Sequence, residues 1–147
     1  MAVHKLQLDY TFKGDAQIVY QSVLDMRLFG KHHPYMTEVN VLQTTNEFTE
    51  FEIKEKVLIF GFIPMKPHYT AKAFEIEKGK HIKYTSPVNK GMDLVIDFHF
   101  NYNAVDNTTS LIENIELTGS SISCKVLSGV IKKAHNILFN VVVQNEK

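Results

Sequence analysis

The sequence has a single cysteine and no excess of either charge. Each of these features excludes some classes of protein. Cys124 cannot form an intramolecular disulfide, which is typical of proteins from a reducing compartment. Lysine and arginine together number 16, as do aspartate and glutamate, so the formal net charge is zero. Nucleic-acid binders usually carry a basic surplus, and the longest basic run here is Lys132-Lys133. We therefore expect a cytoplasmic protein that does not bind nucleic acid.

Long apolar runs are also missing. The longest apolar stretch, from Val57 to Met65, contains Gly61 and Pro64 and is too short to cross a bilayer. The first twelve residues alternate polar and apolar side chains and lack the apolar core of a signal peptide. A chain of 147 residues, 44% hydrophobic and 22% charged, has the size and composition of one globular domain. We predict a single domain over residues 1–147 without an integral membrane segment.

The common catalytic and metal-binding motifs are absent as well. There is no pair of histidines at metal-ligand spacing on one helix, no pair of cysteines, no Gly-x-Ser-x-Gly elbow and no glycine-rich phosphate loop. His99 alternates with Phe98 and Phe100 and is predicted to face outward. His68 and His81 lie near the ends of neighbouring predicted strands and could approach each other. We expect no metal and no cofactor.

The N-terminal third reads as a strand followed by two short helices. From His4 to Phe12 every second residue is large or apolar, which predicts a strand with one buried face. Asp15 is a suitable N-cap for the helix that follows, because its carboxylate can accept from free backbone N–H groups. A second short helix is predicted over Met26 to Lys31. His33-Pro34 then extends the chain, and we expect His32 and His33 to be structural or exposed.

The middle of the chain reads as six more strands and the end as one long helix. The alternation is cleanest from Met92 to Tyr102, and short turns such as Lys78-Gly79 imply antiparallel pairing. After Gly119 the apolar period changes to three or four residues over about 24 residues, roughly 36 Å of helix. Ser120 or Ser121 can cap this helix.

These elements predict an α+β fold. A seven-stranded antiparallel sheet with one apolar face curls around the long C-terminal helix, and two short helices follow the first strand. A strongly bent sheet cannot touch a straight helix along its whole length. We therefore expect a space between the concave face of the sheet and the helix.

At this point the chain resembles the START-related superfamily, which is also called SRPBCC, Bet v-like, or polyketide cyclase/dehydrase and lipid transport. The resemblance rests on Gly14-Asp15-Ala16 at the first helix, on the helix end Val23 to Met26, on His33-Pro34-Tyr35, and on the terminal helix. It implies the helix-grip fold and a hydrophobic-ligand cavity. It implies no single activity, because the fold hosts lipid carriers, hormone receptors, polyketide cyclases and chaperone-activator domains.

Two carboxylates share the apolar face of predicted strands. Glu113 lies between Leu111 and Ile115, and Glu55 lies between Ile53 and Val57. A carboxylate facing an enclosed cavity is costly unless it is solvated, paired or used, and it can orient a ligand or act as an acid or base. The alternative is a position at a strand end, at a bulge or in a wet part of the cavity. Tyr10, Tyr84 and Tyr102 are further inward-facing candidates.

The predicted ligand contacts come from the inner faces of the strands and from the terminal helix. They are Phe51, Ile53, Phe74, Tyr84, Leu94, Ile96, Phe98, Phe100, Tyr102, Leu111, Glu113, Ile115, Val130, Ala134 and Leu138.

Three functions fit this sequence. The first is a carrier or sensor for an apolar small molecule or lipid, held mainly by burial of apolar surface. The second is a cyclase- or dehydratase-like enzyme that uses Glu113 as its acid or base, while Cys124 is read as a small buried residue. The third is a protein-interaction module of the chaperone-activator kind, with a small or filled cavity. The segment Val57 to Met65 could be a portal flap, a homodimer contact or part of the packing under the first helices.

Overall fold

The computed structural model describes residues 2–146 apart from residues 60 and 90, and only the backbone of residues 89 and 141–146. Its elements follow the predicted order. They are β1 (Ala2–Lys13), α1 (Gln17–Leu24), α2 (Met26–His32), β2 (Met36–Thr44), β3 (Thr49–Glu55), β4 (Val57–Ile59), β5 (Ile63–Met65), β6 (His68–Glu77), β7 (His81–Asn89), β8 (Met92–Asn103), β9 (Thr108–Gly119) and α3 (Ser121–Glu146).

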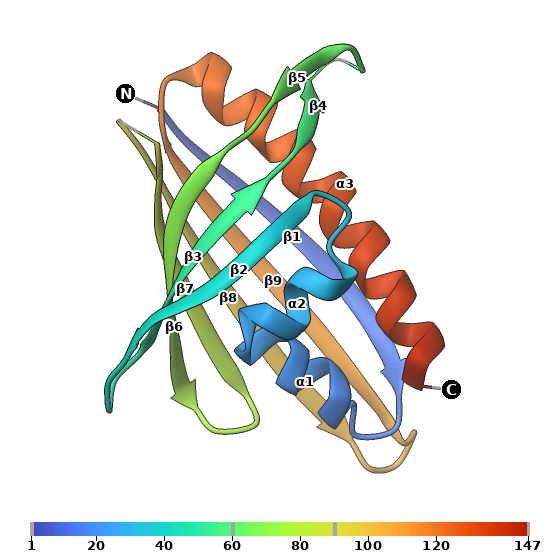
Figure 1. The fold of residues 1–147 in the computed structure, drawn as a ribbon. Coiled ribbons are helices and arrows are strands. Elements are labelled where there is room, and N and C mark those ends of the chain that lie inside the picture. The colour runs from blue at the N-terminus through green and yellow to red at the C-terminus, as the bar shows by residue number, and fades with distance from the viewer. Residues whose placement is uncertain (1, 60, 90, 147) are drawn as a thin grey trace.

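The main sheet has seven strands in the order β1-β9-β8-β7-β6-β3-β2, and every neighbouring pair is antiparallel. It curls around α3, which runs along the open side of the sheet beside β1 (Figure 1). The α1–α2 pair covers one end, and the small hairpin β4–β5 projects at the other (Figure 1). The predicted α+β helix-grip architecture is confirmed.

Alternation decides which side chains enter the core. In β9 the buried residues Leu111, Glu113, Ile115 and Leu117 alternate with exposed Ile112, Asn114 and Glu116. Side chains in a strand point to opposite faces with a period of two, so Glu113 faces the core together with its apolar neighbours. The sequence therefore predicts the orientation of this carboxylate correctly.

The helices begin near the predicted residues, with one shift. The Asp15 carboxylate accepts a hydrogen bond from the Gln17 backbone N–H at 3.4 Å, but the N-cap position itself belongs to Ala16, which adopts a left-handed φ of 54°. Ser120 caps α3, because its hydroxyl oxygen accepts from the Ser123 backbone N–H at 3.2 Å. Both cap interactions satisfy N–H groups that the first turn of a helix leaves free.

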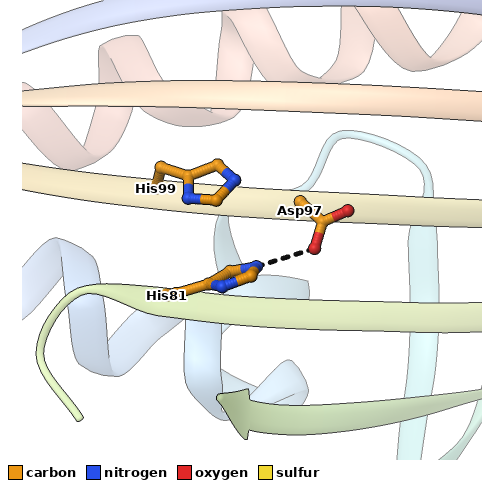
Figure 2. Close-up of side chains that lie close together, drawn as sticks. All are labelled: His81, Asp97 and His99. Carbon is orange, nitrogen blue, oxygen red and sulfur yellow. Dashed lines mark hydrogen bonds and ion pairs between the residues drawn. The ribbon is translucent and has the colours of Figure 1, made fainter. Parts of the chain in front are cut away.

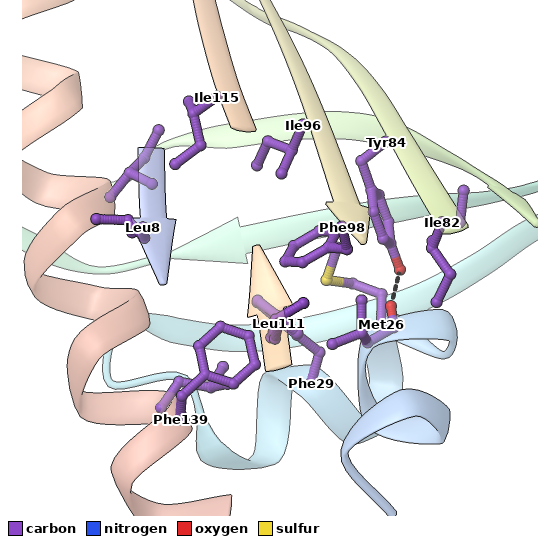
Figure 3. Packing of buried hydrophobic residues seen from close by; sticks show 14 of the residues in the cluster. Leu8, Met26, Phe29, Ile82, Tyr84, Ile96, Phe98, Leu111, Ile115 and Phe139 are labelled. Atoms are coloured by element: carbon purple, nitrogen blue, oxygen red, sulfur yellow. Dashed lines mark hydrogen bonds between the residues drawn. The ribbon is translucent and has the colours of Figure 1, made fainter. Parts of the chain in front are cut away.

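Large aromatic side chains fill the end of the molecule that α1 and α2 cover (Figure 3). The ring of Phe139 on α3 lies 6.4 Å from Phe29 and 6.2 Å from Phe12, centroid to centroid. Tyr84 joins the sheet to the helices, because its buried hydroxyl donates to the Val23 carbonyl at 2.6 Å. That carbonyl belongs to the last turn of α1, where backbone acceptors have no partner within the helix.

We predict that Tyr84→Phe lowers the free energy of unfolding by about 1–3 kcal/mol, because it leaves a buried carbonyl without its donor. Urea denaturation of both proteins measures the difference. Tyr102→Phe is the matched control, since the Tyr102 hydroxyl bonds to exposed Asn107 and its loss should change stability by less than about 0.5 kcal/mol. Equal effects of the two substitutions would contradict a capping role for Tyr84.

Candidate functional site

A cavity of about 470 Å³ lies between the concave face of the sheet and α3. Its walls come from α2, from β3 to β8, and from one face of α3 between Ile122 and His135. Most of the lining side chains are apolar, and the volume falls in the range of small-molecule sites. The expected space between the sheet and the terminal helix is therefore present.

The structure divides the predicted contact residues into three groups. The cavity is lined by Ile53, Tyr84, Leu94, Ile96, Phe98, Val130 and Ala134. Other predicted residues are buried in the core outside this lining: Phe51, Phe100, Leu111, Glu113, Ile115 and Leu138. Contact between any of them and a ligand stays a prediction.

Phe74 and Tyr102 lie elsewhere, and their placement corrects the sequence-based expectation. In β6 the inward positions are taken by Ala71 and Ala73, so Phe74 lies on the outer face, where its ring is 5.5 Å from Phe48. Tyr102 is 48% exposed near the end of β8. The prediction assumed that aromatic residues of a strand point inward, but alternation in β6 gives that face to alanine.

The most buried polar interaction of the site joins Glu113 on β9 to His135 on α3. The Nδ1 atom of His135 is hydrogen-bonded to Oε2 of Glu113, and both side chains are almost fully removed from solvent. Oε1 of Glu113 is buried and has no hydrogen-bond partner among the described residues. His135 lines the cavity and connects it to the carboxylate behind.

His33 is a second imidazole in the cavity wall, and its tautomer follows from one contact. Its Nδ1 atom accepts a hydrogen bond from the Tyr35 backbone N–H at 3.1 Å. Burial, helped by the nearby charge of His135, lowers the pKa of His33 to about 3, so the ring is neutral at physiological pH. A neutral ring with Nδ1 as the acceptor carries its proton on Nε2, which makes Nε2 a donor.

A second pair of polar side chains lies on neighbouring strands. The Tyr69 hydroxyl on β6 donates to the carboxylate of Glu55 on β3. Burial raises the pKa of Glu55, and the hydrogen bond from Tyr69 opposes the rise. Glu55 pairs with Met36 at the start of β2, and His135 is near enough for its charge to act on the Glu55 carboxylate.

The three polar groups gather in one part of the cavity. The ring centroids of His33 and His135 are 6.1 Å apart. Two other hydroxyls of the wall are committed to backbone carbonyls, because Tyr84 donates to Val23 and Ser86 donates to Thr70. Polar side chains of the wall that a ligand could meet are His33, His135, the Glu55–Tyr69 pair and, near the start of α3, Ser123.

The sequence analysis missed His33 and His135 as cavity residues. The expectation that His33 has a structural or exposed role overlooked the turn after α2, which carries the ring inward. His135 follows Ile131 by one helical turn and precedes Phe139 by another. A histidine inside an apolar stripe was the available signal, since that stripe had to face the sheet.

The β4–β5 hairpin and the start of α3 form the rim of the cavity. Val57, Ile63 and Met65 line it from the hairpin, and Ile122 lines it from α3. The rim is apolar yet open to solvent: Phe62 is 74% exposed and Ile122 is 80% exposed. Ile122 lies about 20 Å along the helix from His135, so the rim and the His33–His135 part of the cavity are well separated along α3. Of the three interpretations of the segment Val57 to Met65, a portal flap fits its position at the rim best. Residue 60 of this segment lies outside the described residues.

A scan against protein-family models and a search of curated proteins each found no match. Several solved structures share the fold. The ZhuI aromatase/cyclase from Streptomyces sp. R1128 has a TM-score of 0.76 at 11% identity, covering 98% of this chain and 93% of that one. A START superfamily protein from Mycobacterium smegmatis has a TM-score of 0.71 at 12% identity, covering 96% and 98%. Ara h 8.0201 also has a TM-score of 0.71, at 13% identity, and covers 96% of both chains.

These similarities extend over nearly the whole chain and establish a START-related, SRPBCC-type helix-grip fold, as the sequence resemblance predicted. At such identities they define the fold and not the activity. Among the helices of the described residues, none combines the length and the apolar character needed to span a bilayer.

The buried state of His33 predicts a particular dependence of stability on pH. Its pKa is about 3 in the folded chain and near 6.5 in the unfolded chain, so the unfolded state binds the additional proton below pH 6.5. The stabilising contribution is complete above pH 6.5 and is lost as the pH falls toward 3. His33→Asn keeps an acceptor for the Tyr35 N–H but does not titrate.

Between pH 7 and pH 4 the native protein should therefore lose a few kcal/mol of unfolding free energy relative to His33→Asn. Chemical denaturation across that range measures it, with His32→Asn as the control at the half-exposed neighbour. A constant difference over the whole range would show that His33 is not held neutral by burial.

Proposed function

We propose that this protein binds an apolar small molecule that carries at least one polar group, as a carrier or sensor. The observation that carries the proposal is the cavity of about 470 Å³, with a mostly apolar wall that also contains a few polar side chains. Each Å² of apolar ligand surface removed from water contributes roughly 25 cal/mol. Binding energy would come mainly from the wall, and orientation from the polar groups.

The polar groups favour a neutral oxygen on the ligand. His33 offers an N–H donor, and His135 offers a ring nitrogen whose role depends on the proton that it shares with Glu113. The Glu55 carboxyl group in the cavity wall disfavours a ligand carboxylate beside it. A hydroxyl or carbonyl oxygen, as in an isoprenoid alcohol or a polyketide, is compatible with all three groups.

Native mass spectrometry of the purified protein, followed by extraction and identification of bound molecules, tests the proposal directly. We expect a co-purifying neutral lipid or polyketide-like molecule, or saturable binding of the uncharged fluorescent probe Nile red that apolar alcohols displace. Binding of charged fatty acids in preference to the matching alcohols would contradict the predicted polarity.

Val130→Phe should weaken binding of that probe about tenfold or more, because the new ring occupies cavity volume. Ile137→Phe is the matched control on α3, since Ile137 is half-exposed and does not line the cavity. Equal changes in affinity in the two variants, or no change in either, would show that the probe binds outside the cavity.

A second function, acid–base catalysis on the bound molecule, is favoured by the Glu113–His135 pair. In the tautomer with one proton on Nδ1 of His135, that N–H donates to Glu113 and the Nε2 lone pair can accept a proton from a ligand. When the pair gains a second proton, Nε2 becomes a donor. This arrangement suits a general base positioned by a carboxylate, and it assigns Glu113 a positioning role and not direct contact.

If the protein is such an enzyme, Glu113→Gln should lower turnover of the identified ligand by about 100-fold or more while ligand affinity changes little. Liquid chromatography with mass spectrometry of the incubated ligand measures the turnover. Glu116→Gln, on the exposed face of the same strand, serves as the control. If the native protein releases its ligand chemically unchanged, the catalytic function is contradicted and only the carrier function remains.

A further inference from the structure

A cluster of three metal-ligand side chains lies on the outer face of the sheet. His81 on β7, with Asp97 and His99 on β8, point away from the core (Figure 2). Their inward-facing neighbours are Ile82 and Phe98, which are buried. The cluster is therefore separated from the cavity by the thickness of the sheet, and it has no role in the function proposed above.

The strand register brings these residues together. His81 lies directly opposite His99 in the antiparallel β7–β8 pair, and Asp97 shares their face because it is two residues before His99. The three residues meet through the strand register and not through their spacing on one helix. The sequence analysis therefore predicted no metal site. The possible approach of His68 and His81 does not occur, because His81 lies opposite Glu77 and His68 is at the other end of β6, where it pairs with Glu52 at 3.1 Å.

The donor atoms are already close to one another. Nε2 of His81 is 2.7 Å from Oδ1 of Asp97, the imidazole rings of His81 and His99 are stacked with centroids 4.2 Å apart, and all three donor atoms fit within 4.8 Å. Tetrahedral bonds of about 2.0–2.2 Å place neighbouring ligand atoms roughly 3.3 Å apart. Side-chain rotations alone would bring the donors to that spacing, while the strands keep their places.

The geometry points to a binding site for one borderline divalent transition cation of the Zn²⁺ type, held by His81, Asp97 and His99. Two imidazoles and one carboxylate match the ligand preference of Zn²⁺. Mg²⁺ and Ca²⁺ need six or more oxygen ligands and would find one carboxylate here. Three protein ligands leave a fourth position on the solvent side for water or a small anion.

Charged side chains of both signs surround the cluster. Lys83 lies opposite Asp97 and opposes a cation, whereas Glu77 lies opposite His81 and is itself paired with Lys80 at 3.7 Å. Both stacked imidazoles must be neutral to bind, and the hydrogen bond from His81 to Asp97 must open. The site therefore depends on the two histidines as nitrogen ligands and not on a general negative potential.

Isothermal titration of ZnCl₂ into the full chain, freed of any affinity tag, tests the site. We expect saturable binding of one Zn²⁺ per chain and no response to MgCl₂. His81→Gln and His99→Gln should each weaken the binding at least about tenfold. His68→Gln is the matched control, because it removes a histidine from the same outer surface and leaves the cluster intact.

Imidazole NMR signals provide the second readout. Zn²⁺ should shift the ring resonances of His81 and His99, and those of His33 and His135 should stay in place. Circular dichroism melting without metal shows whether each variant is folded. Absence of a saturable site, or equal affinity in the native protein and in folded His81→Gln and His99→Gln, would overturn the assignment. So would equal loss of binding in His68→Gln.

Discussion

The long helix α3 imposes the central constraint on this molecule. It carries an apolar stripe that needs a cover, and the curved sheet is the largest of the described elements that can provide one. A straight rod and a curved surface touch along part of their length only. At the end covered by α1 and α2, the rings of Phe12, Phe29 and Phe139 fill the gap.

Elsewhere a cavity remains between the sheet and α3. Two of the residues that line it, Ala71 on β6 and Ala134 on α3, are small. Interiors of proteins are otherwise packed about as densely as organic crystals, so a void of this volume has to be built by the choice of side chains. Large aromatic residues thus fill one end of the core, while the curvature of the sheet and small side chains such as these two leave space beside it.

Most of the fold could be predicted from the periodicity of the apolar residues. The period of two along β8 and β9 and the longer period along α3 give the antiparallel sheet, the helix and the inward orientation of Glu113. Periodicity could not tell which inward residues border a void and which border each other. Leu111 and Ile96 have the same sequence pattern, and only Ile96 lines the cavity.

The polar side of the cavity was harder to predict, because its members come from separate elements. His135 finds Glu113 across the gap between helix and sheet, and His33 is turned inward by the segment after α2. Buried polar groups without full partners are rare in folded proteins, since each costs free energy. The buried Oε1 of Glu113, which has no partner among the described residues, therefore makes the Glu113–His135 pair costly for stability.

The two faces of the β7–β8 pair depend on one register. Ile82 and Phe98 face the core because His81 and His99 face outward, and a slip of one residue would exchange the two sets. Such a slip would bury two imidazoles and expose two large apolar side chains, so the hydrophobic cost strongly fixes the pairing. The energy that encloses the cavity therefore also holds the outer histidines opposite each other. An ion bound there would join two strands whose inner side chains Tyr84 and Ile96 form the cavity wall, which places the outer cluster and the cavity on one rigid support.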